Sequence, residues 1–404
     1  MKNILIGQSG GPTAVINSSL AGVIKASISS EKIGKVYGMI NGIDGFLEGN
    51  IKDLEFFSDE SRLKLLRQTP SSYLGSCRRK LPDVQGNEEF YSKLFGLFEK
   101  YNIGYFVYIG GNDSMDTVKK LSAYANAVNS DIVFAGVPKT IDNDLALTDH
   151  TPGFGSAAKF VANSIRQIAM DTSVYNMKSI VVAEIMGRNA GWLTAAASLA
   201  NSEKVSPVDI ILLPETVFDR EAFTERIAQV MSGKNSTVIA VSEGIKDKFG
   251  NYISEGSSPL FDDGFSHATL GGAGKILADE ISNKLKIKTR SIEFSTLQRC
   301  FSQSISLCDS EEAFSVGFLA AQRALSGNSG FMAGFVRVSD EPYKIKTEFF
   351  DVNEIANVEK KVPDNMIGKD KMSVTDDFVR YAKPLIQGEP DLIFKDGVID
   401  LEVR

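Results

Sequence analysis

Two carboxylates, an ammonium and a hydroxyl fall within one short stretch of the chain, Pro138-Lys139-Thr140-Ile141-Asp142-Asn143-Asp144. The residues before it, 132–137, form an apolar run whose β-branched and aromatic content is typical of a buried parallel strand. The polar stretch is therefore expected at the carboxyl end of a strand, where open α/β sheets bind their ligands. One acid could accept a proton while the other holds a metal ion. Taken alone, the same residues would also suit a polar turn.

Length and composition indicate a globular protein with a small substrate. The chain has 404 residues, of which 43% are hydrophobic and 24% are charged, so we expect two domains with separate cores. Its net charge of -7 argues against general binding to nucleic acid or to a membrane surface. We expect neither partner, and any anion site must be a local cluster of lysine and arginine.

The residue inventory narrows the chemistry. The two histidines, His150 and His267, nearly exclude a histidine dyad or a histidine-rich metal site, so any acid or base is expected to be a carboxylate or a lysine. The three cysteines match no metal spacing and cannot all pair, which indicates a reducing compartment. No apolar run approaches the roughly 20 residues of a membrane span, and no leader is recognisable, so we expect a cytoplasmic protein.

Two glycine-rich turns in the first half follow short apolar strands and precede helical patterns. Gly10 and Gly11 lie between a strand at 4–7 and a helix at 14–26, and such turns can present free N–H groups to phosphate. Asn112 and Asp113 lie between a strand at 105–109 and a helix at 115–125. They could cap that helix, or they could reach a bound metal or phosphate.

Cationic and acidic residues occur at further turns. Arg78-Arg79-Lys80 follows a Gly-Ser pair and is interpreted as a clamp on anionic oxygens, with a solvated basic surface as the alternative. A second unit begins with a helix from about 151 to 170, and its strand at 179–185 leads to Met186, Gly187 and Arg188. Its strand at 237–241 leads to Glu243.

The order of these elements predicts an α/β fold of two packed Rossmann-like α/β/α domains with largely parallel sheets. We expect a helix at 192–200, a glycine-rich insertion loop over much of 250–274, a helix at 311–325, strands at 331–338 and 343–348, and a last helix at 376–383. No linker of low complexity separates the units, so the chain is expected to cross between them more than once.

Four motifs occur in an order that resembles the 6-phosphofructokinase family. They are Gly-Gly-x-x-Ser from Gly110, Pro-x-Thr-Ile-Asp-Asn-Asp from Pro138, Met-Gly-Arg-x-x-Gly from Met186, and Gln298-Arg299. The resemblance extends at least from Ser9 to Arg299. It implies a phosphoryl-donor domain of residues 1–150 plus about 298–370, and a fructose 6-phosphate domain of residues 151–297 plus about 371–404.

The resemblance also implies a role for each matching residue. Asp142, helped by Thr140, would take the proton from the sugar 1-hydroxyl, and Asp144 with Asn112 would hold Mg²⁺. Gly11, Arg78, Asp113 and Lys139 would contact the donor. The sugar phosphate would be held by Met186, Gly187, Arg188, Glu243, Arg290 and Arg299. Arg290 is expected to reach a neighbouring subunit's site, which implies a homodimer or homotetramer.

The residues at two donor positions resemble the pyrophosphate-dependent branch of this family. ATP-using members have glycines where this chain has Asp113 and Lys139. A carboxylate at the first place would crowd and repel a nucleotide, and an ammonium at the second would suit a compact, highly charged donor. We therefore expect reversible transfer between pyrophosphate and fructose 6-phosphate. Departures from the family pattern include Asn112 in place of an aspartate and Thr296 in place of a histidine or tyrosine.

Three alternatives remain open on the sequence. The protein could be an ATP-dependent 6-phosphofructokinase. It could also be a silent sugar-phosphate sensor, an interpretation motivated by Asn112 and Thr296 but opposed by the retention of Asp142 and Asp144. The Gly-Gly-x-x turn is also similar to NAD and lipid kinases, although the Met-Gly-Arg and Gln-Arg matches argue against these.

Overall fold

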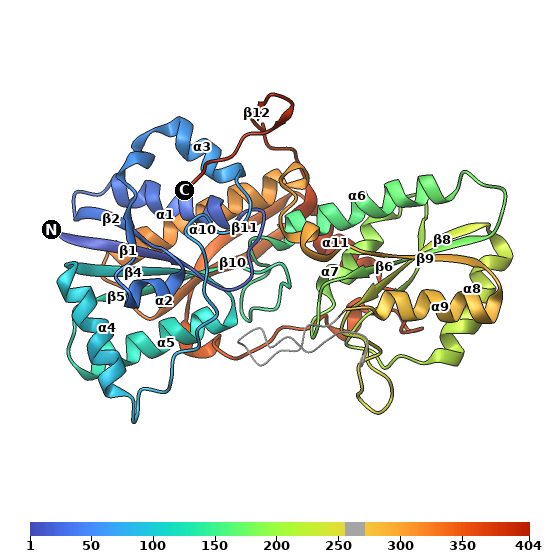
Figure 1. Cartoon of the computed structure of the whole chain (residues 1–404), viewed down its shortest axis with the longest axis horizontal. Coiled ribbons are helices and arrows are strands. Elements are labelled where there is room, and N and C mark those ends of the chain that lie inside the picture. Colours follow the sequence, from blue (N-terminus) through green and yellow to red (C-terminus); the bar gives the residue numbers. More distant parts are fainter. Residues whose placement is uncertain (255–270) are drawn as a thin grey trace.

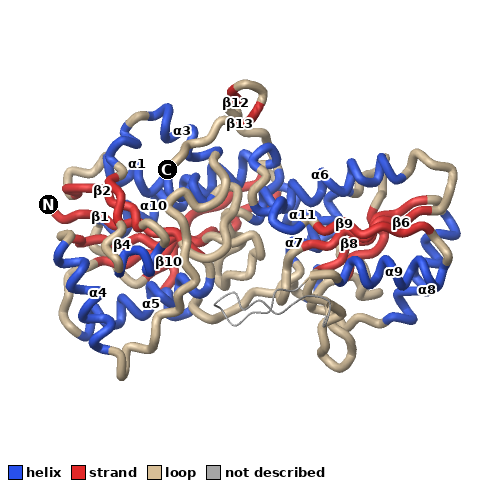
Figure 2. Tube along the Cα trace, viewed as in Figure 1, coloured by secondary structure: helices blue, strands red, loops and turns tan. Residues whose placement is uncertain are grey.

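Two α/β units lie side by side along the long axis of the molecule (Figure 1). The structure is a computed structural model that describes residues 1–254 and 271–404. Most of the expected insertion loop at 250–274, together with His267, lies outside the described residues. Each unit has helices on both faces of its sheet (Figure 2), which confirms the predicted α/β class.

The first sheet has seven strands in the order β11-β10-β5-β4-β1-β2-β3. Their bounds are β1 Lys2–Gln8, β2 Ile33–Met39, β3 Ile51–Asp53, β4 Ile103–Gly110, β5 Val133–Pro138, β10 Phe331–Asp340 and β11 Tyr343–Asp351. The central strands β1, β4 and β5 are neighbours and run parallel, whereas β3 and β11 are antiparallel edge strands. The turns that follow β1, β4 and β5 therefore meet at one edge of the sheet.

Helices cover both faces of this sheet. One apolar core lies beneath α1 (Ile16–Ile28), α3 (Glu60–Gln68) and α10 (Leu307–Leu325). The opposite core lies beneath α2 (Gly42–Leu47), α4 (Glu88–Lys100) and α5 (Asn112–Ala127). Helices α1 and α10 cross closely, because a Cβ at Gly22 would lie 2.0 Å from the Phe314 carbonyl oxygen, and only glycine allows this approach.

The second sheet is smaller and entirely parallel, in the order β7-β8-β6-β9. Its strands are β6 Ser179–Ile185, β7 Val208–Leu212, β8 Ser236–Ser242 and β9 Lys288–Glu293. Helices α6 (Phe154–Thr172), α7 (Trp192–Ala195) and α11 (Asp376–Ala382) contribute to the core on one face, and α8 (Arg220–Gly233) and α9 (Ala273–Leu285) to the core on the other. The sequence analysis did not identify β9, because this edge strand carries three charged residues, Lys288, Arg290 and Glu293.

Two local predictions need correction. The expected helix at 192–200 is α-helical only to Ala195 and then tightens to a 3₁₀ helix at Ala196–Ala200. The helix expected to begin at about 151 begins at Phe154 as α6, and its N-cap residue Gly153 has no side chain to cap it. Asp309 of α10 accepts hydrogen bonds there from the Gly153 and Ser156 amides at 2.9 and 2.8 Å. A carboxylate from a distant helix thus satisfies donors that would otherwise be buried without partners.

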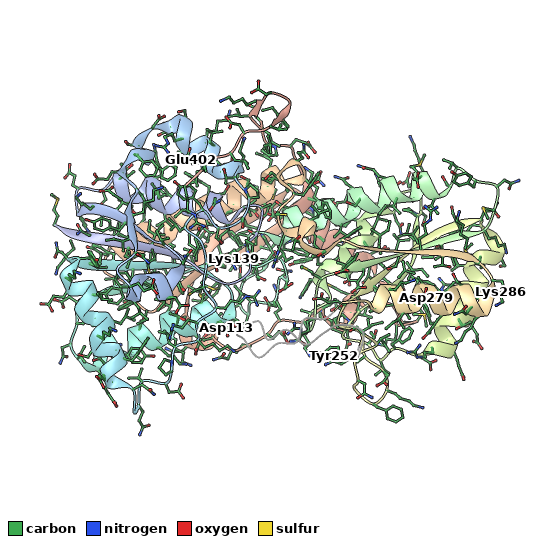
Figure 3. The ribbon with its side chains drawn as sticks, viewed as in Figure 1. Asp113, Lys139, Tyr252, Asp279, Lys286 and Glu402 are labelled. Atoms are coloured by element: carbon green, nitrogen blue, oxygen red, sulfur yellow. The ribbon has the colours of Figure 1, made fainter. Side chains whose placement is uncertain are left out.

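The chain crosses between the two units more than once. After α10, strands β10 and β11 return to the first sheet, and residues 357–363 then lead back to the second unit. The last residues do not all stay there. Helix α11 lies in the second core, but the Gln68 side chain of α3 hydrogen-bonds the chain at Ile393 and Asp400. Glu402, labelled in Figure 3, forms an ion pair with Arg62 of α3. The strands β12 (Phe394–Lys395) and β13 (Val398–Ile399) form a small hairpin between Ile393 and Asp400.

None of the helices in the described part of the chain is long and apolar enough to cross a membrane.

Candidate active site

A cavity of about 640 Å³ is lined by residues from both α/β units, including the carboxyl-end turns of β1, β4 and β5. The predicted site residues that line it are Gly11, Arg78, Asn112, Asp113, Lys139, Thr140, Asp142, Asp144, Met186, Arg188, Glu243 and Arg299. Gly187 and Arg290 are the predicted site residues that are absent from the described lining. Gly187 still belongs to this wall, because its amide faces the Glu243 carboxylate at 3.4 Å. Arg290 is exposed on the edge strand β9.

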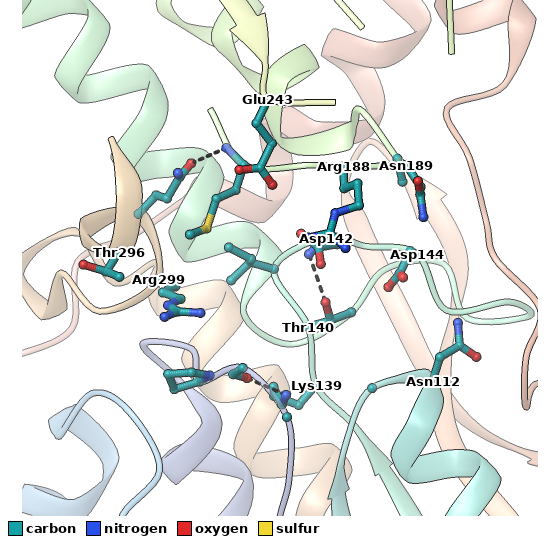
Figure 4. Close-up of a pocket in the computed structure, with 18 of the residues that line it drawn as sticks. Asn112, Lys139, Thr140, Asp142, Asp144, Arg188, Asn189, Glu243, Thr296 and Arg299 are labelled. Carbon is teal, nitrogen blue, oxygen red and sulfur yellow. Dashed lines mark hydrogen bonds between the residues drawn. The ribbon is translucent and has the colours of Figure 1, made fainter. Parts of the chain in front are cut away.

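The Pro138–Asp144 stretch leaves β5 and forms the floor between the two units. The Asp142 amide donates to the Thr140 hydroxyl oxygen at 3.1 Å (Figure 4). Asn143 has a φ of 55°, in the left-handed region that few residues other than glycine adopt. Its side chain is held on both sides, because its Nδ2 donates to the Tyr381 hydroxyl at 2.8 Å and its Oδ1 accepts from the Thr151 amide at 3.1 Å. The backbone that carries both aspartates is therefore held by side-chain contacts.

Burial raises the pKa of both aspartates. For Asp142 the desolvation is opposed by the nearby Lys139 ammonium and by the contact with Thr140, and the pKa still lies above its ordinary value. For Asp144 burial acts together with the charge of Asp142 and brings the pKa to about 7. A carboxylate whose pKa is raised toward neutral pH is a stronger general base than one in water.

Lys139 lies on the side of the cavity that faces the first glycine-rich turn. Its Nζ donates to the Gly11 carbonyl oxygen at 2.6 Å, and its side chain is almost fully buried (Figures 3 and 4). Burial lowers the pKa of Lys139 to about 8, although the charges of Asp142 and Asp144 oppose the shift. The ammonium is thus the main form at neutral pH. It is positioned to balance the negative charge of a bound anion.

The glycine-rich turn after β1 is shaped for close approach. Gly10 has a φ of 75°, and a Cβ there would lie 3.3 Å from the Lys139 Nζ. A Cβ at Gly11 would lie 3.4 Å from the Arg299 guanidinium, so Arg299 faces this turn. The Ser76 hydroxyl donates to the Gly10 carbonyl oxygen at 2.7 Å and fixes the turn to the segment that carries Arg78.

The turn after β4 rules out one of the two alternatives that the sequence left open, a helix cap formed by Asn112 or Asp113. Helix α5 begins at Asn112, its N-cap is Gly111, and no side chain caps it. Asp113 instead pairs with Lys80 at 3.2 Å. The Lys80 side chain is about half exposed and the Asp113 side chain about one third exposed, so the pair adds little to the free energy of folding. Its effect is to fix the position of the Asp113 carboxylate, which lines the cavity.

The phosphofructokinase resemblance implies Mg²⁺, and the residues present fit it. The Oδ1 atom of Asn112 is buried without a hydrogen-bond partner in the described part of the chain, while its Nδ2 donates to the Val358 carbonyl oxygen at 3.0 Å. Asp142 and Asp144 repel each other, and a cation would relieve this. The described residues hold no group of three or more acidic, histidine or cysteine side chains that could bind a metal by themselves.

The opposite wall comes from the second unit. Glu243 follows β8, and burial together with the charge of Asp142 raises its pKa to about 7. The Gln298 side chain accepts a hydrogen bond from the Met186 amide at 3.3 Å and fixes the turn after β6. The Arg188 side chain extends toward Asp142 (Figure 4). A hydroxylated anion bound here would thus face acceptors and cations at once.

Several lining residues were not found by the sequence analysis. Asn189 follows Arg188 directly and could have been found from its place after a strand end. Glu359 could not, since it follows no strand and belongs to no motif, yet its charge contributes to the raised pKa of both Asp142 and Asp144. Thr296, noted as a departure from the family pattern, lines the cavity beside Gln298.

The geometry suits the movement of a phosphoryl group. Carboxylates with a raised pKa, several cations and a glycine-rich turn surround one cavity between two α/β domains, and phosphoryl transfer depends on such positioning and charge neutralisation. The fold and the cavity together define a phosphotransferase.

Comparison with known proteins identifies the family. The sequence matches the Phosphofructokinase family over residues 3–323. A pyrophosphate–fructose 6-phosphate 1-phosphotransferase from Methylococcus capsulatus is 39% identical over 402 residues, which cover 99% of this chain and 95% of that protein. The protein of the same name from Xanthomonas campestris is 40% identical, over 98% of this chain and 94% of that protein. The crystal structure of a pyrophosphate-dependent phosphofructokinase from Nitrosospira multiformis matches with a TM-score of 0.89 at 36% identity, covering 99% of this chain and 95% of that one. The chain belongs to the phosphofructokinase family.

Proposed function

We propose that the protein transfers a phosphoryl group from pyrophosphate to the 1-hydroxyl of fructose 6-phosphate, giving fructose 1,6-bisphosphate and phosphate. The observation that carries the choice of donor is the buried Lys139 ammonium beside Gly11 and Asp142, which gives a compact, highly charged anion a counter-ion. Asp113 lines the cavity and pairs with Lys80, and its carboxylate would repel the additional phosphate of a nucleotide donor. The names of the relatives agree with this donor.

The residues divide the reaction between them. Asp142 accepts the proton of the sugar 1-hydroxyl, whose oxygen forms a bond to the terminal phosphorus of pyrophosphate. The bond from that phosphorus to the bridging oxygen breaks, and phosphate leaves. Lys139 and Arg78 balance the charge on the donor side, and Arg299 would help to hold the sugar phosphate. Bound Mg²⁺, held by Asp144 and Asn112, would supply further positive charge to the phosphate oxygens.

The acceptor lies on the second unit in this proposal. Met186, Gly187, Arg188 and Glu243 would bind fructose 6-phosphate, and the unit with the seven-stranded sheet would bind pyrophosphate. The reaction breaks one phosphoanhydride bond in pyrophosphate and forms one phosphate ester bond on the sugar. This leaves both directions accessible, so we propose a reversible reaction.

We further propose that two copies share each sugar-phosphate site. Arg290 is the site residue that supports this, since it is exposed on the edge strand β9 and does not line the cavity of its own chain. A homodimer or homotetramer would bring it to a neighbouring site. Sedimentation of the purified protein should then show an oligomer with an even number of chains.

The donor is tested directly with the purified protein. Fructose 6-phosphate and Mg²⁺ are supplied with either pyrophosphate or ATP at equal concentrations, and fructose 1,6-bisphosphate is measured. We expect turnover with pyrophosphate and little with ATP, because the cavity offers the donor a buried ammonium while the Asp113 carboxylate in its lining would repel a nucleotide. Turnover with ATP alone would favour an ATP-dependent enzyme, and binding of fructose 6-phosphate without turnover on either donor would favour a sensor.

A further inference from the structure

Residues 357–363, called the crossing segment below, connect the two units directly over the candidate active site. On one side, Val352 and Ile355 belong to the core of the first unit, and on the other, Val362 belongs to the core of the second. The crossing segment lies beyond residues 3–323, which match the family, and no sequence motif marks it. It nevertheless contacts the catalytic region at several points.

The backbone of the crossing segment holds the residues proposed to act on the phosphoryl group. The Lys360 amide donates to the Asp144 carbonyl oxygen at 2.7 Å, and Glu359 forms an antiparallel bridge with Leu145. The Val358 carbonyl oxygen accepts the Asn112 side chain at 3.0 Å. The paired aspartates and the start of α5 are thus attached to one strand-like piece of chain.

The side chain of Lys360 extends this attachment. Its Nζ donates to the carbonyl oxygens of Thr148 and Asp149 at 3.0 and 2.8 Å, and it lies 3.5 Å from the Asn143 Oδ1. One ammonium therefore contacts the loop that follows Asp142 at its beginning and at its end. Since Asn143 has left-handed backbone angles, the loop needs such contacts to keep its shape.

The second unit holds Lys360 in place. The Trp192 indole N–H donates to the Lys360 carbonyl oxygen at 3.0 Å, and the Lys360 Nζ lies 5.2 Å from the centre of the Trp192 ring. Two residues further on, the Val362 amide donates to Glu215, which also accepts from the Gly191 amide. These contacts fix the position of the loop at 143–149 relative to the second unit, which carries the proposed sugar site.

We propose that Lys360 is a positioning residue for phosphoryl transfer: it holds the loop at 143–149, and with it the carboxylates of Asp142 and Asp144, in register with the acceptor on the second unit. The proposal rests on the proposed function for its kinetic consequences but not for its structural ones.

A purely space-filling role would not require a charge at this place. Burial lowers the pKa of Lys360 to about 8, although Asp149 and Asp144 oppose the shift, so keeping an ammonium here has a cost. An apolar side chain of similar length would avoid that cost. What it could not do is donate to the oxygens of Thr148, Asp149 and Asn143.

The test compares Lys360→Met with Lys361→Met. Methionine keeps the length of the side chain and removes the donors, and Lys361 is the adjacent, exposed lysine. For Lys360→Met we expect kcat to fall by about 10²-fold, because a small misplacement of reacting groups has an effect of this size. The KM for fructose 6-phosphate should be nearly unchanged. Amides of residues 143–149 should exchange hydrogen faster than in the unaltered protein. Lys361→Met should change neither quantity.

Folding is checked with the single tryptophan, Trp192, whose emission should stay that of a buried indole in both variants. If Lys360→Met does not fold, Lys360→Gln, which keeps a neutral donor, should show the same kind of change to a smaller extent. The proposal is overturned by native kcat and native exchange in the Lys360 variant. It is also overturned by a loss of activity that comes from weakened sugar binding with kcat unchanged. If the unaltered protein has no turnover with pyrophosphate, the proposed function fails, and the exchange measurement alone then decides the role of Lys360.

Discussion

Replacement of Asp142 by asparagine should lower kcat by about 10²–10⁴-fold, the range over which general bases contribute to catalysis. The substitution keeps the size of the side chain and the backbone contact with Thr140, but it removes the acceptor for the sugar proton. Since Asp142 is one of several residues around each substrate, the KM values for fructose 6-phosphate and pyrophosphate should change little. Steady-state kinetics in both substrates measure the two effects separately.

The matched control for Asp142 is Asp131→Asn, at an exposed position just before β5. That variant should keep native kinetics. A native kcat in the Asp142 variant, with its folding verified by circular dichroism, would remove the base from the mechanism and with it the assignment of the Pro138–Asp144 stretch.

Replacement of Lys139 by methionine should lower kcat/KM for pyrophosphate by about 10²-fold or more, because removing one partner of a buried charge pair costs about 2–5 kcal/mol. The Lys139 Nζ contacts the Gly11 carbonyl oxygen and is the buried cation of the donor side. The KM for fructose 6-phosphate should be less affected, since Lys139 lies away from Glu243. Lys93→Met, on the exposed side of α4, is the control and should be neutral.

The same residue predicts a pH dependence. Burial lowers the pKa of Lys139 to about 8, so the ammonium is present below this pH and is lost above it. Since the ammonium is the form that binds the donor, kcat/KM for pyrophosphate should fall as the pH rises through about 8. Lys139→Met is the control here as well, because titration of pyrophosphate itself affects both proteins equally. A profile of the same shape in both proteins would contradict the role given to Lys139.

Much of the site could be predicted because the sheet brings strand ends together. An apolar run followed by polar residues identifies the end of a parallel strand, and β1, β4 and β5 each carry this signal. Once these strands are neighbours, Gly11, Asn112 and Asp142 must lie near one edge. This pattern depends only on the local sequence, so the strand ends can be predicted without knowing how the two units pack.

Contacts that depend on that packing could not be predicted. Lys360, Tyr381 and Asp309 act on the loop at 143–149 or on the start of α6, but each is more than 150 positions away in the chain from the groups it holds. A lone lysine or tyrosine in an irregular segment has no periodicity that reveals its partner. The pairing of Asp113 with Lys80 was missed for the same reason. It joins two turns whose distance from each other depends on how the intervening helix packs on the sheet.

Edge and short elements were the other source of error. Strand β9 was not predicted because Lys288, Arg290 and Glu293 interrupt any apolar pattern. An edge strand can carry charged residues and does not need an apolar pattern. The 3₁₀ helix at Ala196–Ala200 has an alanine-rich sequence that favours α-helix. Its packing against α6 and α11 has therefore overridden the local propensity.

The central claim is that this cavity moves a phosphoryl group between pyrophosphate and fructose 6-phosphate. The reverse direction tests it most directly: the protein is given fructose 1,6-bisphosphate, phosphate and Mg²⁺, with no nucleotide, and the mixture is followed by phosphorus NMR. The account predicts that a pyrophosphate signal grows together with that of fructose 6-phosphate, and that the Asp142→Asn variant produces neither. Formation of fructose 6-phosphate without pyrophosphate, or a reaction that begins only when ADP is added, would contradict it.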